Sequence, residues 1–92
     1  MDQNLMVTLI VGKAKSFLDE FAKKYANTYG LEGSARLVSE KQVKLIICGD
    51  SDRVDDFISL LYQNFEKYKI EDISVEPYFR ERDYRGIFRV IA

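Results

Sequence analysis

The chain contains no histidine and only one cysteine among its 92 residues. Without histidine, catalytic triads of the Ser-His-Asp or Cys-His type are excluded, and so are His-based zinc and iron sites. One cysteine, Cys48, can form neither an internal disulfide nor a cysteine-rich metal site. Any chemistry must therefore come from positioned water, cations, backbone amides, a carboxylate or a lysine. The sequence predicts no metal and no cofactor.

An excess of charge and a long apolar run are also missing. Fourteen Lys and Arg against fifteen Asp and Glu give a formal charge of -1, so no strong field attracts nucleic acid or an anionic membrane. There is no apolar stretch of about 18 residues for a spanning helix. The start, Met1–Asn4, lacks the basic and apolar parts of a signal peptide. We therefore expect a cytoplasmic protein with no nucleic-acid and no membrane partner.

What the chain does contain is enough apolar surface for one packed core. The hydrophobic content is 47%, with six Phe and six Tyr, and a chain of this length is expected to form a single domain, residues 1–92. No linker or low-complexity segment divides it.

The spacing of apolar residues alternates between the periods of strands and helices. A first helix is expected to start at a capping box of Ser16 and Asp19 and to end at Gly30. Pro77 cannot donate a ladder hydrogen bond, which places its strand at a sheet edge or Pro77 near a strand end. Predicted strands cover 5–11, 34–39, 43–48, 70–78 and 87–91, and predicted helices cover 16–29 and 51–68. This order predicts an α+β, ferredoxin-like split β-α-β sandwich: an antiparallel sheet with two helices on one face.

Three short motifs fall at the spacing of a known enzyme family. Gly30-Leu31-Glu32-Gly33 matches a glycine-leucine-x-glycine that closes a first helix, and 33–37 stands where the family reads G-W-V-R-N. Residues 43–49 match its V-E-V-V-A-E-G strand at the same distance from Gly33. Smaller anchors are Phe57, Ile70, Ile73 and the closing 88–90. The chain thus resembles the acylphosphatases, hydrolases of carboxyl-phosphate anhydrides.

The resemblance implies a phosphate-binding loop, in the family G-x-V-Q-G-V-x-F-R, whose arginine and amides bind phosphate. An asparagine on the next strand orients the attacking water. Here the loop, 12–19, is one residue shorter and lacks the second glycine. Counted back from Gly30, the arginine position falls on Asp19, and the asparagine position falls on Leu37. Aspartate lacks the planar fork of donors that matches phosphate, and leucine cannot hold a water. The sequence predicts a domain that has lost hydrolase activity.

An anion site rebuilt from other groups remains open. Strand-to-helix loops present free amides and a positive helix end to anions. The candidates are Gly12, Lys13, Ala14, Lys15, Ser16 and Arg36. The plainer interpretation makes the lysines solvated charges, Ser16 a helix cap and Arg36 a surface charge on the open sheet face, pointing away from Leu37.

Two functions of different classes follow, with a small-molecule regulatory domain as a weaker third. The first is a domain without hydrolase activity that binds a small anion, phosphate or carboxylate, or a protein. The second is a divergent acylphosphatase that uses Lys13 or Lys15 for charge and backbone amides for the oxyanion. A protein partner, or a second copy in a homodimer, would use the open sheet face; a monomer is the alternative. The apolar residues expected on that face are Met6, Thr8, Ile10, Val38, Ile46 and Cys48. The mixed aromatic and charged stretch 78–85 is interpreted as a salt-bridged loop.

Overall fold

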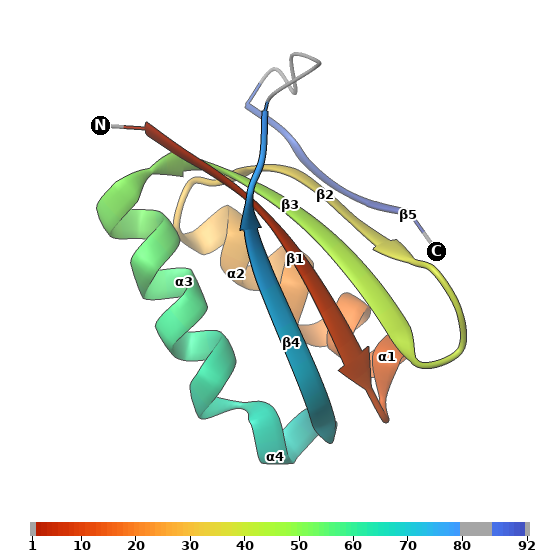
Figure 1. Ribbon diagram of the computed structural model, residues 1–92. Helices are drawn as coiled ribbons and strands as arrows, with labels where there is room; N and C mark the ends of the chain where they lie inside the picture. The colour runs from red at the N-terminus through yellow and green to blue at the C-terminus, as the bar shows by residue number, and fades with distance from the viewer. Residues whose placement is uncertain (1, 80–85, 92) are drawn as a thin grey trace.

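The computed structural model describes residues 2–79 and 86–91, so most of the charged stretch 78–85 lies outside the described residues. Figure 1 shows one curved sheet with helices packed against a single face. The strands are β1 (Asp2–Val11), β2 (Glu32–Leu37), β3 (Gln42–Asp50), β4 (Ile70–Pro77) and β5 (Phe88–Ile91). The helices are α1 (Ala14–Ser16), η1 (Phe17–Ala22), α2 (Lys23–Thr28), α3 (Ser51–Gln63) and α4 (Phe65–Tyr68).

The strand order β4-β1-β3-β2-β5 confirms the predicted split β-α-β sandwich. β4 lies at one edge of the sheet and ends at Pro77, in agreement with both alternatives predicted for this residue. The predicted all-antiparallel sheet is wrong in one pair, because β5 runs parallel to β2. The reason is topological. β5 joins the sheet at the edge opposite β4 and runs antiparallel to β4. β2 also runs antiparallel to β4, so β5 and β2 are parallel. The sheet is therefore mixed.

The core lies between the sheet and the helices. Alternate residues of the central strands point into it and are fully buried, among them Val7, Leu9 and Leu45. From the helical side, the ring of Phe21 lies 5.2 Å from Phe17 and 5.6 Å from Phe57, measured between ring centroids. Burying each such side chain contributes on the order of 1.5–3 kcal/mol. This aromatic cluster joins η1 to α3.

Two glycines fix the connection from the first helices to β2. Gly30 has a φ of 66°, and Leu31 N–H donates to the Ala26 carbonyl at 2.8 Å. That geometry confirms Gly30 as the end of the helix. Gly33 has a φ of 138°, and a Cβ there would overlap the carbonyl of Ile46 in β3. Only glycine fits at this position.

The predicted first helix is in fact three consecutive pieces, with α1 and α2 separated by the π-helix η1. It begins at Ala14 rather than Ser16, and neither Lys13 nor Ser16 makes a side-chain capping hydrogen bond. The predicted capping box of Ser16 and Asp19 is therefore wrong, because Ser16 already lies inside the helix. A π-helical turn holds one residue more than an α-helical turn. We refer to residues 14–28 as the first helical segment.

The predicted second helix is also divided. α3 ends at Gln63, and α4 follows after Asn64, whose Nδ2 donates to the Leu60 carbonyl at 2.8 Å. The chain leaves α4 through Lys69, which has a left-handed φ of 54°. This turn brings the carbonyls of Tyr68 and Lys69 against the start of the first helical segment.

Candidate functional site

The loop between β1 and the first helical segment is held shut by backbone hydrogen bonds. Gly12 N–H donates to the Lys69 carbonyl at 2.8 Å, and Lys13 N–H donates to the Tyr68 carbonyl at 3.1 Å. A Cβ on Gly12 would lie 2.8 Å from the Cβ of Lys69, so the two backbones meet closely. Two of the amides proposed to bind an anion are therefore already engaged within the protein.

Three candidate amides remain at the start of the helix. Ala14, Lys15 and Ser16 form its first turn, whose N–H groups have no carbonyl partner inside the helix. The first intrahelical bond runs from Phe17 N–H to the Lys13 carbonyl at 2.9 Å. The side chains of Lys13 and Lys15 are exposed beside these amides. The arrangement offers positive charge to a solvent anion, without the enclosed cradle of the family loop.

The residue at the family's arginine position carries no positive charge in either possible register. Asp19 lies in η1 and its side chain is exposed. If an acylphosphatase helix is a regular α-helix, the extra residue of η1 moves the position counted back from Gly30 to Leu18. Leu18 is 1% exposed and packs in the core. Neither side chain can form the charged, forked contact with a phosphate that arginine makes.

The structure separates the two remaining candidate residues on β2. Leu37 pairs with Val43 and packs against the core, so it has the orientation of an inward residue and no polar group. Arg36 is exposed and lies opposite Lys44 on the open face of the sheet. Strand alternation predicted this separation. The sheet therefore lies between Arg36 and the helix start, and Arg36 takes no part in a site there.

The open sheet face is less apolar than expected. Cys48 is 0% exposed and Ile46 is 9% exposed, so neither offers surface to a partner. Val38 is 48% exposed, but it follows β2 in the turn rather than lying on the sheet. Met6, Thr8 and Ile10 are half-buried. The expected apolar face is therefore wrong at Ile46 and Cys48, whose side chains are buried.

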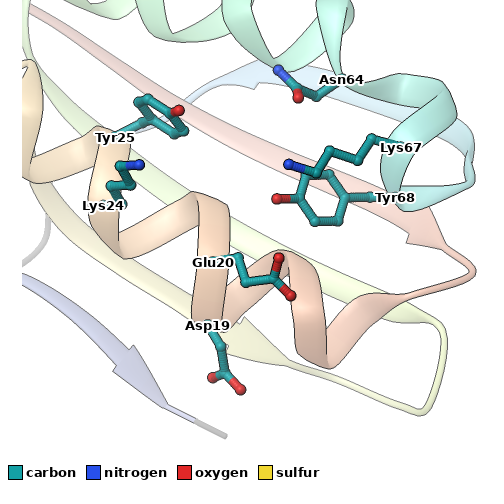
Figure 2. Close-up of a pocket in the computed structure, with 7 residues that line it drawn as sticks. All are labelled: Asp19, Glu20, Lys24, Tyr25, Asn64, Lys67 and Tyr68. Atoms are coloured by element: carbon teal, nitrogen blue, oxygen red, sulfur yellow. The ribbon is translucent and has the colours of Figure 1, made fainter.

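Sequence reasoning missed a groove between the first helical segment and the α3–α4 segment, which lie side by side on one face of the sheet. It has a volume of about 430 Å³, and its lining residues, shown in Figure 2, are Asp19, Glu20, Lys24, Tyr25, Asn64, Lys67 and Tyr68. The two halves of the lining are about 40 residues apart in sequence, so no local motif marks the groove. The sequence signal that the two halves share is a lysine followed directly by a tyrosine, Lys24-Tyr25 in one half and Lys67-Tyr68 in the other.

Two negative findings apply to the described residues. Within 2–79 and 86–91, no group of three or more His, Cys, Asp or Glu side chains is placed to hold a metal ion. In the same part of the chain, no helix has the length and apolarity needed to cross a membrane.

The strand order and the one-sided helices place the protein in the ferredoxin-like class of α+β folds. The acylphosphatase family model matches residues 17–90, and the chain belongs to the acylphosphatase family. The matched range begins after residues 12–16 and includes Asp19 and Leu37.

Individual relatives agree with that assignment. An acylphosphatase from Caldivirga maquilingensis is 30% identical over 67 residues, which cover 72% of this chain and 70% of the relative. The structure of a Coxiella burnetii acylphosphatase superposes with a TM-score of 0.82 at 24% identity, covering 98% of this chain and 93% of that one. Full-length HypF in its phosphate- and nucleotide-bound form also gives a TM-score of 0.82, at 17% identity over 100% of this chain and 12% of its own. The same fold thus occurs within a much longer protein.

Proposed function

We propose that residues 1–92 form a single acylphosphatase-like domain that does not hydrolyse acyl phosphates and acts by binding a small anion at the start of its first helical segment. One observation carries the proposal: Gly12 and Lys13, the first amides of the loop, donate to the carbonyls of Lys69 and Tyr68. A phosphate cannot use amides that are already bonded. The loop is closed on the protein itself.

The replaced side chains support the same conclusion. Removing one positioned donor to a developing charge commonly costs on the order of a hundredfold to a thousandfold in rate. Asp19 adds repulsion, worth roughly 1 kcal/mol at 4 Å in bulk water. Leu37 packs into the core and offers no hydrogen bond to a water. Loss of the cation and of the water-positioning group together leaves the scaffold without the family's chemistry.

Anion binding is supported by the charges that remain. The amides of Ala14, Lys15 and Ser16 and the exposed ammonium groups of Lys13 and Lys15 surround one helix end. Such a site suits inorganic phosphate or a carboxylate. Because it is open to solvent, we expect binding in the millimolar range, about −4 kcal/mol. The proposal includes a cytoplasmic location, which the single cysteine favours.

The second candidate is a divergent acylphosphatase in which Lys13 or Lys15 supplies charge and the three free amides hold the oxyanion. Membership of the family favours it. An assay of acetyl phosphate hydrolysis distinguishes the two functions. We expect the protein to release phosphate from acetyl phosphate no faster than a control that contains buffer and heat-denatured protein. A clear excess over that rate, reduced by Lys15→Ala, would overturn the proposed function and establish the second candidate.

A further inference from the structure

The groove between the first helical segment and the α3–α4 segment has an aromatic floor. The rings of Tyr25 and Tyr68 both contact Phe21, with centroid distances of 4.9 and 5.9 Å, and Tyr68 also meets Phe17 edge-on at 5.6 Å. Phe17 and Phe21 are fully buried. The two tyrosines are therefore fixed by the core, and the groove above them is part of the folded structure.

Each tyrosine carries a lysine above its ring. Lys24 Nζ lies 5.2 Å from the centroid of Tyr25, and Lys67 Nζ lies 5.5 Å from the centroid of Tyr68. The attraction between an ammonium group and an aromatic face holds each lysine near its ring. Figure 2 shows the two ammonium groups reaching from opposite helices toward the space between them.

A carboxylate stands at the same groove without forming an ion pair. Glu20 precedes Lys24 by four residues, the spacing that normally pairs the two on an α-helix. Among the described residues, no ion pair joins them within 4.0 Å. Glu20 lies in η1, whose wider turn alters that alignment. Asp19 and Glu20 both line the groove. In Figure 2 the Glu20 side chain lies on the side of Lys67 and Tyr68, whereas the Asp19 carboxylate is directed away from those two residues.

We propose that this groove binds a small zwitterion of amino-acid or dipeptide size. Its carboxylate would lie between Lys24 and Lys67, and its ammonium group would meet Glu20. A simple anion is repelled by Glu20 and a simple cation by the lysines, so a ligand with both charges complements the groove best.

The volume of the groove and the uncharged side chain of Asn64 also suit a ligand of this kind. The volume of about 430 Å³ lies in the range of small-molecule sites. Asn64 Nδ2 is engaged with the Leu60 carbonyl, which leaves its amide oxygen to accept from a ligand N–H. The groove uses none of the residues 12–16, so this inference does not rest on the proposed function of the loop.

Titration of the ¹⁵N-labelled protein with diglycine, followed by amide chemical shifts, tests the proposal. N-acetyldiglycine and diglycinamide, which each lack one charge, are matched probes. We expect saturable shifts around Lys24 and Lys67, with diglycine binding at least tenfold more tightly than either blocked form. Absence of saturable shifts, or equal binding of N-acetyldiglycine, would overturn the proposal.

Charge-neutral variants assign the contacts. Lys24→Gln with Lys67→Gln should weaken diglycine binding about tenfold or more, and Glu20→Gln should weaken it while improving binding of N-acetyldiglycine. Arg36→Gln with Lys41→Gln, which lie in neither the loop nor the groove, is the control that should leave diglycine affinity unchanged. All five side chains are exposed, so the variants should fold, as a thermal melt will show. Loss of binding in this control variant alone would refute the assignment to the groove.

Discussion

Gly12 and Lys69 lie in direct backbone contact: the N–H of Gly12 donates to the Lys69 carbonyl at 2.8 Å, and Lys69 is held at a φ of 54°. The contact joins the end of β1 to the turn between α4 and β4, which are distant in sequence. It occupies an amide that the family resemblance assigned to phosphate, and it requires a residue without a side chain at position 12. The same contact therefore serves the fold and closes the loop.

Gly12→Ala should destabilise the protein by about 1–3 kcal/mol, because the new Cβ would lie 2.8 Å from the Cβ of Lys69. Chemical denaturation with urea measures the change. In a Lys69→Gly background the penalty should shrink, because the opposing Cβ is gone and glycine adopts the left-handed turn freely. Equal penalties in the two backgrounds would show that the two residues are not coupled.

Two glycines with positive φ should differ sharply in their tolerance of alanine. Gly33→Ala should cost about 3 kcal/mol or more, because strain at φ 138° is added to overlap with the Ile46 backbone. Gly30→Ala should cost only about 1–2 kcal/mol, since no atom lies within 4 Å of its Cβ. Thermal unfolding of both variants measures the difference. Similar melting temperatures would contradict the close approach of β2 to β3 at Gly33.

Phosphate affinity should depend on the loop lysines and not on Arg36. Lys13→Gln with Lys15→Gln should weaken binding several-fold and reduce its dependence on salt, because two exposed charges beside the helix end are removed. Arg36→Gln is the matched control, since Arg36 lies on the other face of the sheet. Isothermal titration with inorganic phosphate gives both affinities. A loss with Arg36→Gln alone would move the anion site to the open face.

Asp19→Arg with Leu37→Asn restores the two family side chains at the counted positions. We expect phosphate affinity to rise, because a repulsive charge becomes an attractive one, while acetyl phosphate hydrolysis stays at the buffer rate. The reason is that Gly12 and Lys13 still donate to carbonyls of the turn at Lys69. Hydrolysis well above buffer in this variant would show that the closed loop does not prevent catalysis.

Cys48 should resist thiol reagents in the folded protein, because it is 0% exposed. Labelling with a chromogenic disulfide reagent should be slow in buffer and fast in urea. Rapid labelling without denaturant would contradict the burial of this residue and reopen the sheet face as an apolar surface.

The sequence specified those parts of the structure that depend on local chemistry. Gly30 ends its helix, Pro77 marks an edge strand, and alternation separates Arg36 from Leu37. The parallel pairing of β5 escaped prediction because it depends on which sheet edge accepts the last strand. The π-helix escaped because its residues are ordinary helix formers and its extra residue is set by packing. The groove escaped because the two segments that carry Lys24 and Lys67 come together only through the fold.

The π-helix also changes how the chain distributes its length. A residue taken into η1 is a residue that the preceding loop does not have, and the shortened loop can lie flat against the turn at Lys69. The difference in loop length lies entirely before Gly30, and the strands beyond keep the family's spacing. The fold can therefore persist after the loop has lost the dimensions that its original chemistry required.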